Sequence, residues 1–135
     1  MIDRIQEHQE SGRILLLEDN EGNRQMMSDY LSYYGYDLLT IRQGKDLFDA
    51  IATFKPDVIL LDLKLPDISG FTLLQELRES SKWANIPVIV VSAFAFRSDQ
   101  QRAFDLGIQD YLVKPIDLHQ LRTVIQKKLL RSDDD

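Results

Sequence analysis

Residues 58–70 read V-I-L-L-D-L-K-L-P-D-I-S-G, and the other segments of the chain are best understood in relation to them. Four aliphatic residues lead directly to a single carboxylate, Asp62. A short continuous apolar run bounded by turn residues predicts a strand that is buried on both faces of a parallel sheet. A carboxylate at the end of such a strand costs free energy unless another group pairs with it. We therefore expect the rest of the chain to supply a partner for Asp62.

The apolar pattern predicts four further strands, at residues 13–17, 36–41, 87–91 and 110–113. Helical patterns follow the strands at residues 20–34, 44–54, from Ser69 with apolar residues at positions 71, 74 and 77, at 98–106 and from about 117. Ser69 and the capping-box pair Ser98 and Gln101 are predicted to begin helices, and Gly35 and Gly107 are predicted to end them. This alternation predicts an α/β fold, a doubly wound five-stranded parallel sheet with five helices on its two faces. The expected strand order is 2-1-3-4-5, with ligands binding at the carboxyl ends beside strands one and three.

The composition suits a single domain without disulfides, because the chain has 135 residues and no cysteine. We expect a polar leader at residues 1–12, one folded domain at 13–131 and an acidic tail at 132–135. Acidic residues outnumber basic ones by 22 to 16, which argues against direct binding of nucleic acid. No apolar run approaches the ~20 residues of a membrane span, and the leader does not have the pattern of a secretory signal. The sequence therefore predicts a cytoplasmic protein.

Polar side chains follow four of the five predicted strands. Strand one leads to Glu18 and Asp19, strand three to Asp62, strand four to Ser92, and strand five to Lys114. Each of these is common alone as a cap or turn residue, but the topology brings all of them to one edge of the sheet. Three carboxylates there would raise one another's pKa values, and a hard divalent cation such as Mg²⁺ would relieve their repulsion. A carboxylate nucleophile, Mg²⁺, an ammonium and a hydroxyl together suit phosphoryl transfer.

Residues 13–130 resemble the receiver domain of two-component response regulators. The resemblance rests on Glu18-Asp19, Asp62 within L-L-D-L-K-L-P-D-I-S-G, Ser92-Ala93 after an apolar strand, and Lys114-Pro115. It implies a flavodoxin-like fold of the stand-alone, single-domain type, similar to the chemotaxis response regulator.

The resemblance also implies what each site residue does. Asp62 would accept a phosphoryl group from a phosphohistidine donor. Asp19 and Asp62 would bind Mg²⁺ directly, Glu18 through a water molecule, and Lys64 through its backbone carbonyl. The first acid is more commonly Asp in this family, and the longer Glu18 still reaches a metal-bound water.

Three further residues would bind the phosphoryl group or transmit its presence. Lys114 would neutralise phosphoryl oxygens, and Ser92 would donate a hydrogen bond to one of them. Tyr111 would turn inward when Ser92 moves, which changes the face formed by the fourth helix, fifth strand and fifth helix. The Lys114–Pro115 peptide bond is often cis in this family.

The expected function is a phosphorylated signalling switch in a two-component phosphorelay, and not an enzyme. The chain would catalyse only its own phosphorylation and slow dephosphorylation. A sensor histidine kinase or a histidine phosphotransfer protein would donate the phosphoryl group. Output would come from binding a downstream protein target or from passing the phosphoryl group on, without contact with nucleic acid or a membrane. The same helix-strand-helix face could also join two copies into a homodimer.

Three other functions fit the sequence less well. A Mg²⁺-dependent phosphohydrolase with an aspartyl-phosphate intermediate usually carries a second acid where this chain has Lys64. A flavin-binding module would need a Ser/Thr/Gly-rich loop after strand one, where residues 18–24 read E-D-N-E-G-N-R. A degenerate receiver used as a scaffold would lack some of the chemical residues, and here all are present.

The loop after Ser92 is unusually apolar, since residues 93–96 read A-F-A-F. Phe94 and Phe96 are expected to pack against the edge of the sheet. The alternative is that one of them is exposed and anchors a protein partner.

Overall fold

The computed structural model describes residues 10–134 of the chain. Residues 1–9 of the expected leader, and Asp135 at the end of the expected tail, lie outside this part. The strands are β1 (Arg13–Leu17), β2 (Asp37–Ile41), β3 (Val58–Leu61), β4 (Val88–Ser92) and β5 (Asp110–Val113). The helices are α2 (Glu21–Tyr33), α3 (Leu47–Phe54), α4 (Gly70–Glu79), α5 (Arg97–Asp105) and α6 (Leu118–Asp134), with the 3₁₀ helix η1 (Gly44–Asp46) before α3.

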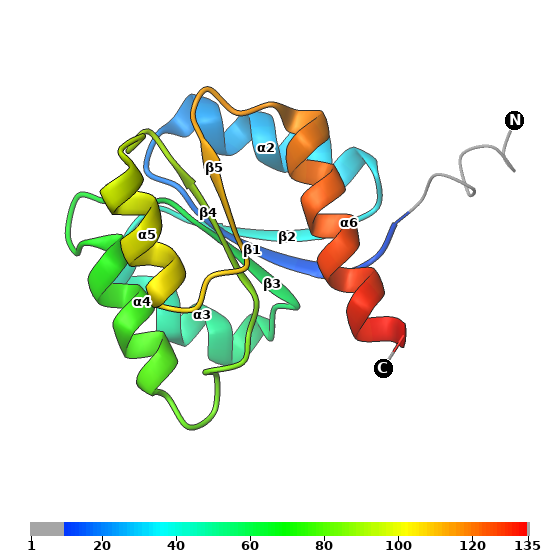
Figure 1. Ribbon diagram of the computed structural model, residues 1–135. Coiled ribbons are helices and arrows are strands. Elements are labelled where there is room, and N and C mark those ends of the chain that lie inside the picture. The colour runs from blue at the N-terminus through cyan, green and yellow to red at the C-terminus, as the bar shows by residue number, and fades with distance from the viewer. Residues whose placement is uncertain (1–9, 135) are drawn as a thin grey trace, which may run out of the picture.

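The strands form one parallel sheet in the order β2-β1-β3-β4-β5, as the sequence predicted (Figure 1). β3, the strand that leads to Asp62, is central, because Leu61 pairs with Leu17 of β1 on one side and with Val90 of β4 on the other. The backbone N–H of Asp62 donates to the carbonyl of Leu17, 3.1 Å away. This register places the residues that follow β1 and β3 beside each other.

Both faces of the sheet are buried, which explains why the strands are apolar throughout. Successive side chains of a strand point to opposite faces. Ile59 and Leu61 pack with α3, α4 and α5, whereas Val58 and Leu60 pack with α2 and α6 (Figure 1). All four are at most 1% exposed, and burial of each stabilises the fold by about 2 kcal/mol.

Local capping explains some helix starts but not all. The prediction for Ser69 is confirmed, since its Oγ accepts a hydrogen bond from the N–H of Phe71 at 3.2 Å. The predicted capping box at Ser98 and Gln101 is wrong, because α5 begins at Arg97 and its N-cap, Phe96, makes no side-chain capping bond. The loop before α5 is instead held by contacts from β4 and β5, described below.

The two predicted glycine stops are confirmed, since Gly35 and Gly107 both have positive φ angles just after α2 and α5. The helix predicted at residues 44–54 starts as the 3₁₀ turn η1 before it becomes α3. No helix in the described part of the chain is long and apolar enough to cross a membrane.

Candidate functional site

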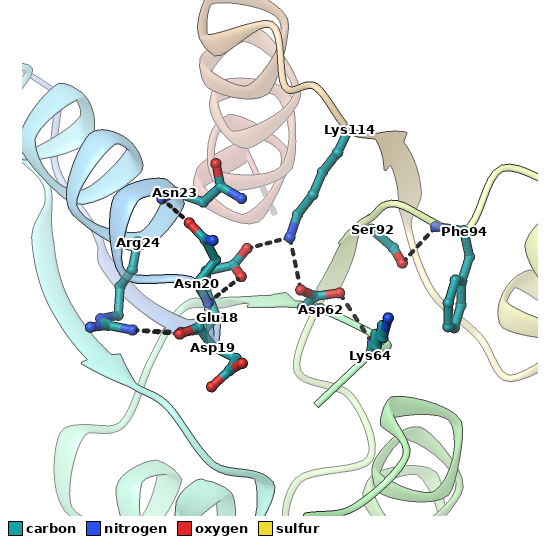
Figure 2. Close-up of polar contacts among 10 residues, drawn as sticks. All are labelled: Glu18, Asp19, Asn20, Asn23, Arg24, Asp62, Lys64, Ser92, Phe94 and Lys114. Carbon is teal, nitrogen blue, oxygen red and sulfur yellow. Dashed lines mark hydrogen bonds and ion pairs between the residues drawn. The ribbon is translucent and has the colours of Figure 1, made fainter. Parts of the chain in front are cut away.

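The carboxyl edge of the sheet brings four of the predicted residues together (Figure 2). Glu18 follows β1, Asp62 follows β3, Ser92 ends β4, and Lys114 follows β5. Glu18, Asp62 and Ser92 are 1%, 4% and 0% exposed. They are the buried polar residues of the described chain, so the polar atoms inside this fold are concentrated at one place.

Lys114 is the partner that Asp62 requires. Its Nζ lies 2.8 Å from Asp62 Oδ2 and 2.8 Å from Glu18 Oε1, so one ammonium stands between two buried carboxylates. Lys114 is carried there by the sheet, because its backbone N–H donates to the carbonyl of Ser92 at 2.8 Å. The Lys114–Pro115 peptide bond is cis. Charge-assisted contacts of this length are among the stronger ones in proteins, and they compensate for the removal of water from both acids.

Backbone N–H groups bind the remaining carboxylate oxygens. Asp62 Oδ1 accepts from the N–H of Lys64 at 3.1 Å, and Glu18 Oε2 accepts from the N–H of Asn20 at 3.0 Å. Glu18 Oε1 is buried, and its partner is the Lys114 ammonium, 2.8 Å away. Each oxygen of Asp62 and of Glu18 thus has one partner, either the Lys114 ammonium or a backbone N–H.

The protonation of this site follows from burial and from the ion pairs. Burial raises the pKa of Glu18, and the Asp62 charge adds to this, against the opposing contacts from Lys114 and Asn20. Burial alone would lower the pKa of Lys114, but the hydrogen bonds to Asp62 and Glu18 outweigh it and raise that pKa. The lysine therefore stays charged at neutral pH.

Asp19 stands apart from the other acids. Its side chain is exposed, and its carboxylate makes no hydrogen bond or ion pair with residues 10–134 (Figure 2). Within those residues, no three acidic or histidine side chains are grouped as a ready-made metal site. At the end of β3, the Asp62 carboxylate therefore contacts the Lys114 ammonium and is not part of a preformed cluster of three carboxylates in residues 10–134.

The donor chemistry nevertheless fits a hard divalent cation. Carboxylate and backbone carbonyl oxygens are the ligands that Mg²⁺ prefers, and Glu18, Asp19, Asp62 and Lys64 supply both kinds at this edge. The Asp19 carboxylate is exposed and makes no hydrogen bond or ion pair with residues 10–134, so both of its oxygens are open to such a cation. Binding would require the Lys114 ammonium to give up part of its contact with the acids.

Ser92 and Tyr111 both contact the backbone of Phe94. Ser92 Oγ accepts from the Phe94 N–H at 3.1 Å, and the Tyr111 hydroxyl donates to the Phe94 carbonyl at 2.7 Å. Tyr111 is 8% exposed, and burial raises its pKa although the nearby Ser92 hydroxyl opposes the change. The two residues proposed to form a switch are thus linked through the backbone of one residue, Phe94, in the loop before α5.

The two phenylalanines of that loop differ in environment. Phe94 is half-buried and packs against the core, as expected, whereas Phe96 is 77% exposed. The expectation that Phe96 packs against the edge of the sheet is therefore wrong, and the alternative of an exposed partner anchor remains a prediction for Phe96.

Sequence reasoning did not anticipate two side chains that hold the loops of the site. The Asp67 carboxylate accepts from the N–H groups of Gly44 and Lys45, each at 2.9 Å, and so ties the loop after β3 to η1. Arg24 Nη1 donates to the carbonyls of Glu18 and Asp19 at 3.0 and 3.2 Å. Little in the neighbouring sequence predicts either contact. The only indications are that Asp67 lies within P-D-I-S-G and that Arg24 is a cation early in the helix after the acidic pair.

Comparison with known proteins agrees with this geometry. A model of the response regulator receiver domain family matches residues 14–126. The polar-differentiation response regulator DivK of Brucella anthropi is 33% identical over 116 residues, which cover 86% of this chain and 94% of that protein.

Solved structures agree as well. The signal receiver domain of a putative Luxo repressor protein from Vibrio parahaemolyticus has a TM-score of 0.83 and 30% identity, covering 92% of this chain and 94% of that one. The Mn²⁺-bound form of response regulator Rcp1 has a TM-score of 0.73 and 26% identity, covering 84% and 88%. The likeness therefore extends over the whole sheet and its covering helices.

Proposed function

The chain belongs to the response regulator receiver domain family, and from this we propose that it is a signalling switch phosphorylated on Asp62. The switch domain would span residues 13–131. Receiver domains are switches and not classical enzymes, so the expected chemistry is the protein's own phosphorylation and slow dephosphorylation. A sensor histidine kinase or histidine phosphotransfer protein would be the donor.

The observation that carries the proposal is the environment of Asp62. This carboxylate is 4% exposed, yet it is held by Lys114 Nζ at 2.8 Å and by the Lys64 N–H at 3.1 Å. One Asp62 oxygen would form a bond to phosphorus as the bond from phosphorus to the donor's imidazole nitrogen breaks. Fixing the nucleophile before the reaction is a large part of what a protein contributes to phosphoryl transfer.

A divalent cation would be bound by Glu18, Asp19, Asp62 and the backbone carbonyl of Lys64. When bound, Mg²⁺ would neutralise part of the charge on the transferred group. Lys114 would then exchange part of its contact with the acids for a contact with a phosphoryl oxygen. Its raised pKa supports this role, because the contacts with Asp62 and Glu18 keep the ammonium charged before the reaction.

The signal would leave the site through the loop after β4. Ser92 would give up the Phe94 N–H to donate to a phosphoryl oxygen, and the loop that precedes α5 would follow. Tyr111 contacts the Phe94 carbonyl and would carry the change into β5. This is a two-state equilibrium biased by one new charged contact. A downstream protein, or a second copy of the chain, would bind the face of α5, β5 and α6.

The test is the intact mass of the chain after incubation with Mg²⁺ and acetyl phosphate. The wild-type protein is expected to gain one phosphoryl group, Asp62→Asn none, and the exposed control Asp46→Asn one. Removal of Mg²⁺ with a chelator should abolish the gain. The proposal is wrong if the wild type gains no mass with any small phosphoryl donor, or if Asp62→Asn gains as much.

A further inference from the structure

Asp19 differs from the other acids of the site in how its carboxylate is held. Lys114 and backbone N–H groups contact the carboxylates of Glu18 and Asp62. The Asp19 carboxylate has no such contact within residues 10–134, as Figure 2 shows. Its direction therefore depends on the conformation of its own backbone.

Arg24 holds that backbone. Its Nη1 donates to the carbonyl of Glu18 at 3.0 Å and to the carbonyl of Asp19 at 3.2 Å, on both peptide units that flank Asp19 (Figure 2). Two fixed carbonyls on consecutive peptide units leave little freedom in the dihedral angles of Asp19. The direction in which its side chain leaves the main chain is thereby set.

The position of Arg24 in α2 explains how it reaches the loop. Side chains of a helix tilt toward its N-terminus, so a long side chain in the first turn lies back over the preceding segment. The Arg24 backbone N–H donates to the Asn20 carbonyl at 2.9 Å, and Asn20 Oδ1 accepts from the Asn23 N–H at 2.8 Å. The first turn of the helix is thus a rigid base from which the guanidinium extends.

The charge of Arg24 and its two hydrogen bonds predict opposite effects on the affinity for a divalent cation. A positive charge beside three carboxylates repels an incoming divalent cation, so on charge alone its removal would strengthen cation binding. A role in positioning predicts the reverse, since loss of the two carbonyl contacts frees Asp19. The sign of the effect therefore separates the two roles.

We propose that Arg24 is a positioning residue for the divalent-cation site, because it holds the two carbonyls that direct the Asp19 carboxylate. The inference rests on the proposed function. Residues that orient a metal ligand without touching the metal typically change metal affinity by about 10- to 100-fold. We expect Arg24→Met to weaken cation binding by about 10-fold, at the lower end of that range, because the lost charge partly offsets the lost contacts.

The direct measurement is the dissociation constant for Mn²⁺, obtained from the electron paramagnetic resonance signal of the free ion with the full chain and no phosphoryl donor. Arg42→Met is the matched control, since Arg42 is exposed at the same edge of the sheet and makes no hydrogen bond to the acidic pair within residues 10–134. Arg24→Met should bind Mn²⁺ more weakly than the wild type, and Arg42→Met as tightly or more tightly. Equal or tighter binding by Arg24→Met would overturn the proposal.

A double-mutant cycle with Asp19→Asn tests whether Arg24 acts through Asp19. The proposal predicts that Arg24→Met adds little to the loss already caused by Asp19→Asn. Fully additive losses would show that Arg24 acts elsewhere and would overturn it. If Arg24→Met does not fold, Arg24→Gln replaces it in both measurements, because glutamine is too short to contact both carbonyls.

The phosphorylation reaction gives a second readout that a purely structural role would not change. With acetyl phosphate, Arg24→Met should need more Mg²⁺ for half-maximal rate and should regain the wild-type rate at saturating Mg²⁺. An unchanged Mg²⁺ requirement would contradict the inference. If the wild-type chain binds no Mn²⁺ and gains no phosphoryl group, the proposed function itself fails; if only the Arg24 comparison fails, the proposed function stands.

Discussion

The Tyr111 hydroxyl donates a 2.7 Å hydrogen bond to the carbonyl of Phe94, and so joins β5 to the loop that follows β4. The N–H of the same residue donates to Ser92 Oγ at 3.1 Å. Both polar backbone groups of Phe94 are therefore bound by the two side chains that we propose as the switch. A change at either side chain is therefore expected to alter this loop, because an unpaired, partly buried backbone group costs free energy.

Tyr111→Phe is expected to lower the free energy of unfolding by about 1 kcal/mol, because it removes the hydroxyl donor and leaves the Phe94 carbonyl unpaired. Urea denaturation measures this change. Tyr33→Phe is the control, since Tyr33 is 82% exposed, and it should be neutral. Equal stability of the Tyr111 variant and the wild type would contradict the role given to this hydrogen bond.

Lys114→Met is expected to destabilise the protein by about 3 kcal/mol, because Asp62 and Glu18 would be left as buried carboxylates without a counter-ion. Added Mg²⁺ should restore part of the loss, since the cation supplies the missing positive charge. Thermal unfolding with and without Mg²⁺ measures both effects. The exposed Lys127→Met is the control and should show neither. If Lys114→Met unfolds at the wild-type temperature and Mg²⁺ does not change that temperature, the ion pairs do not contribute to stability.

Asp67→Ala is expected to lower stability in a pH-dependent way. Desolvation raises the pKa of Asp67, but backbone N–H groups, those of Lys45 and Gly44 foremost, together lower it more, so the net shift is downward from 3.8. A carboxyl whose pKa is lower in the folded state stabilises the fold above its ordinary pKa, and this contribution is lost as the pH falls through the folded value.

The difference in unfolding free energy between wild type and Asp67→Ala should therefore be constant above about pH 5 and shrink below 3.8. Urea denaturation over a series of pH values tests this. Asp46→Ala, in the adjacent turn, serves as the control, because no hydrogen bond to its carboxylate is made by residues 10–134. A difference that is independent of pH would exclude the carboxylate as the source.

Gly70→Ala is expected to destabilise the protein by about 2 kcal/mol, because there is no space for a side chain. A Cβ at Gly70 would lie 2.6 Å from Leu63 Cα and 2.8 Å from the Asp62 carbonyl, both backbone atoms. Moving this backbone would also displace Asp62, so phosphorylation by acetyl phosphate should slow. Gly22→Ala is the matched control, since its nearest contact would be Asn20 Oδ1 at 3.4 Å. If neither variant changes the stability or the rate of phosphorylation, the close packing of Gly70 against Asp62 and Leu63 does not constrain the site.

Phe94→Ser is expected to lower the stability of the fold, and Phe96→Ser is not. Phe94 packs against the core, so its loss should lower the unfolding free energy by about 2 kcal/mol, whereas Phe96 is 77% exposed and its loss should be neutral. If Phe96 anchors a protein partner, Phe96→Ser should weaken binding of the phosphorylated chain to its cognate partner, measured by calorimetry. Unchanged affinity would remove Phe96 from the partner surface.

The sequence was sufficient to predict the strands, the helices and the order of the strands in the sheet. Uninterrupted apolar runs such as residues 58–61 identify strands buried on both faces, and this property depends only on local composition. The register that follows brings Glu18 and Asp62 together, because both residues directly follow adjacent parallel strands. The resemblance to receiver domains then indicated the roles of the polar residues.

Several features could not be predicted because they depend on groups distant in sequence. The start of α5 at Arg97, and not at Ser98, reflects a loop held by Ser92 and Tyr111, which local capping rules do not include. The contact of Asp67 with Gly44 spans 23 residues, and no spacing rule relates them.

The sequence by itself determined the fold, the edge of the sheet that carries the site, and the residue types gathered there. These follow from hydrophobic periodicity and from the rule that parallel strands end together. The tertiary structure decided how the charges are distributed among those residues. It places one ammonium between Asp62 and Glu18 and leaves the Asp19 carboxylate without a contact from the described residues. Side-chain direction and backbone anchoring arise only when the loops are packed against one another, and a linear pattern does not encode that packing.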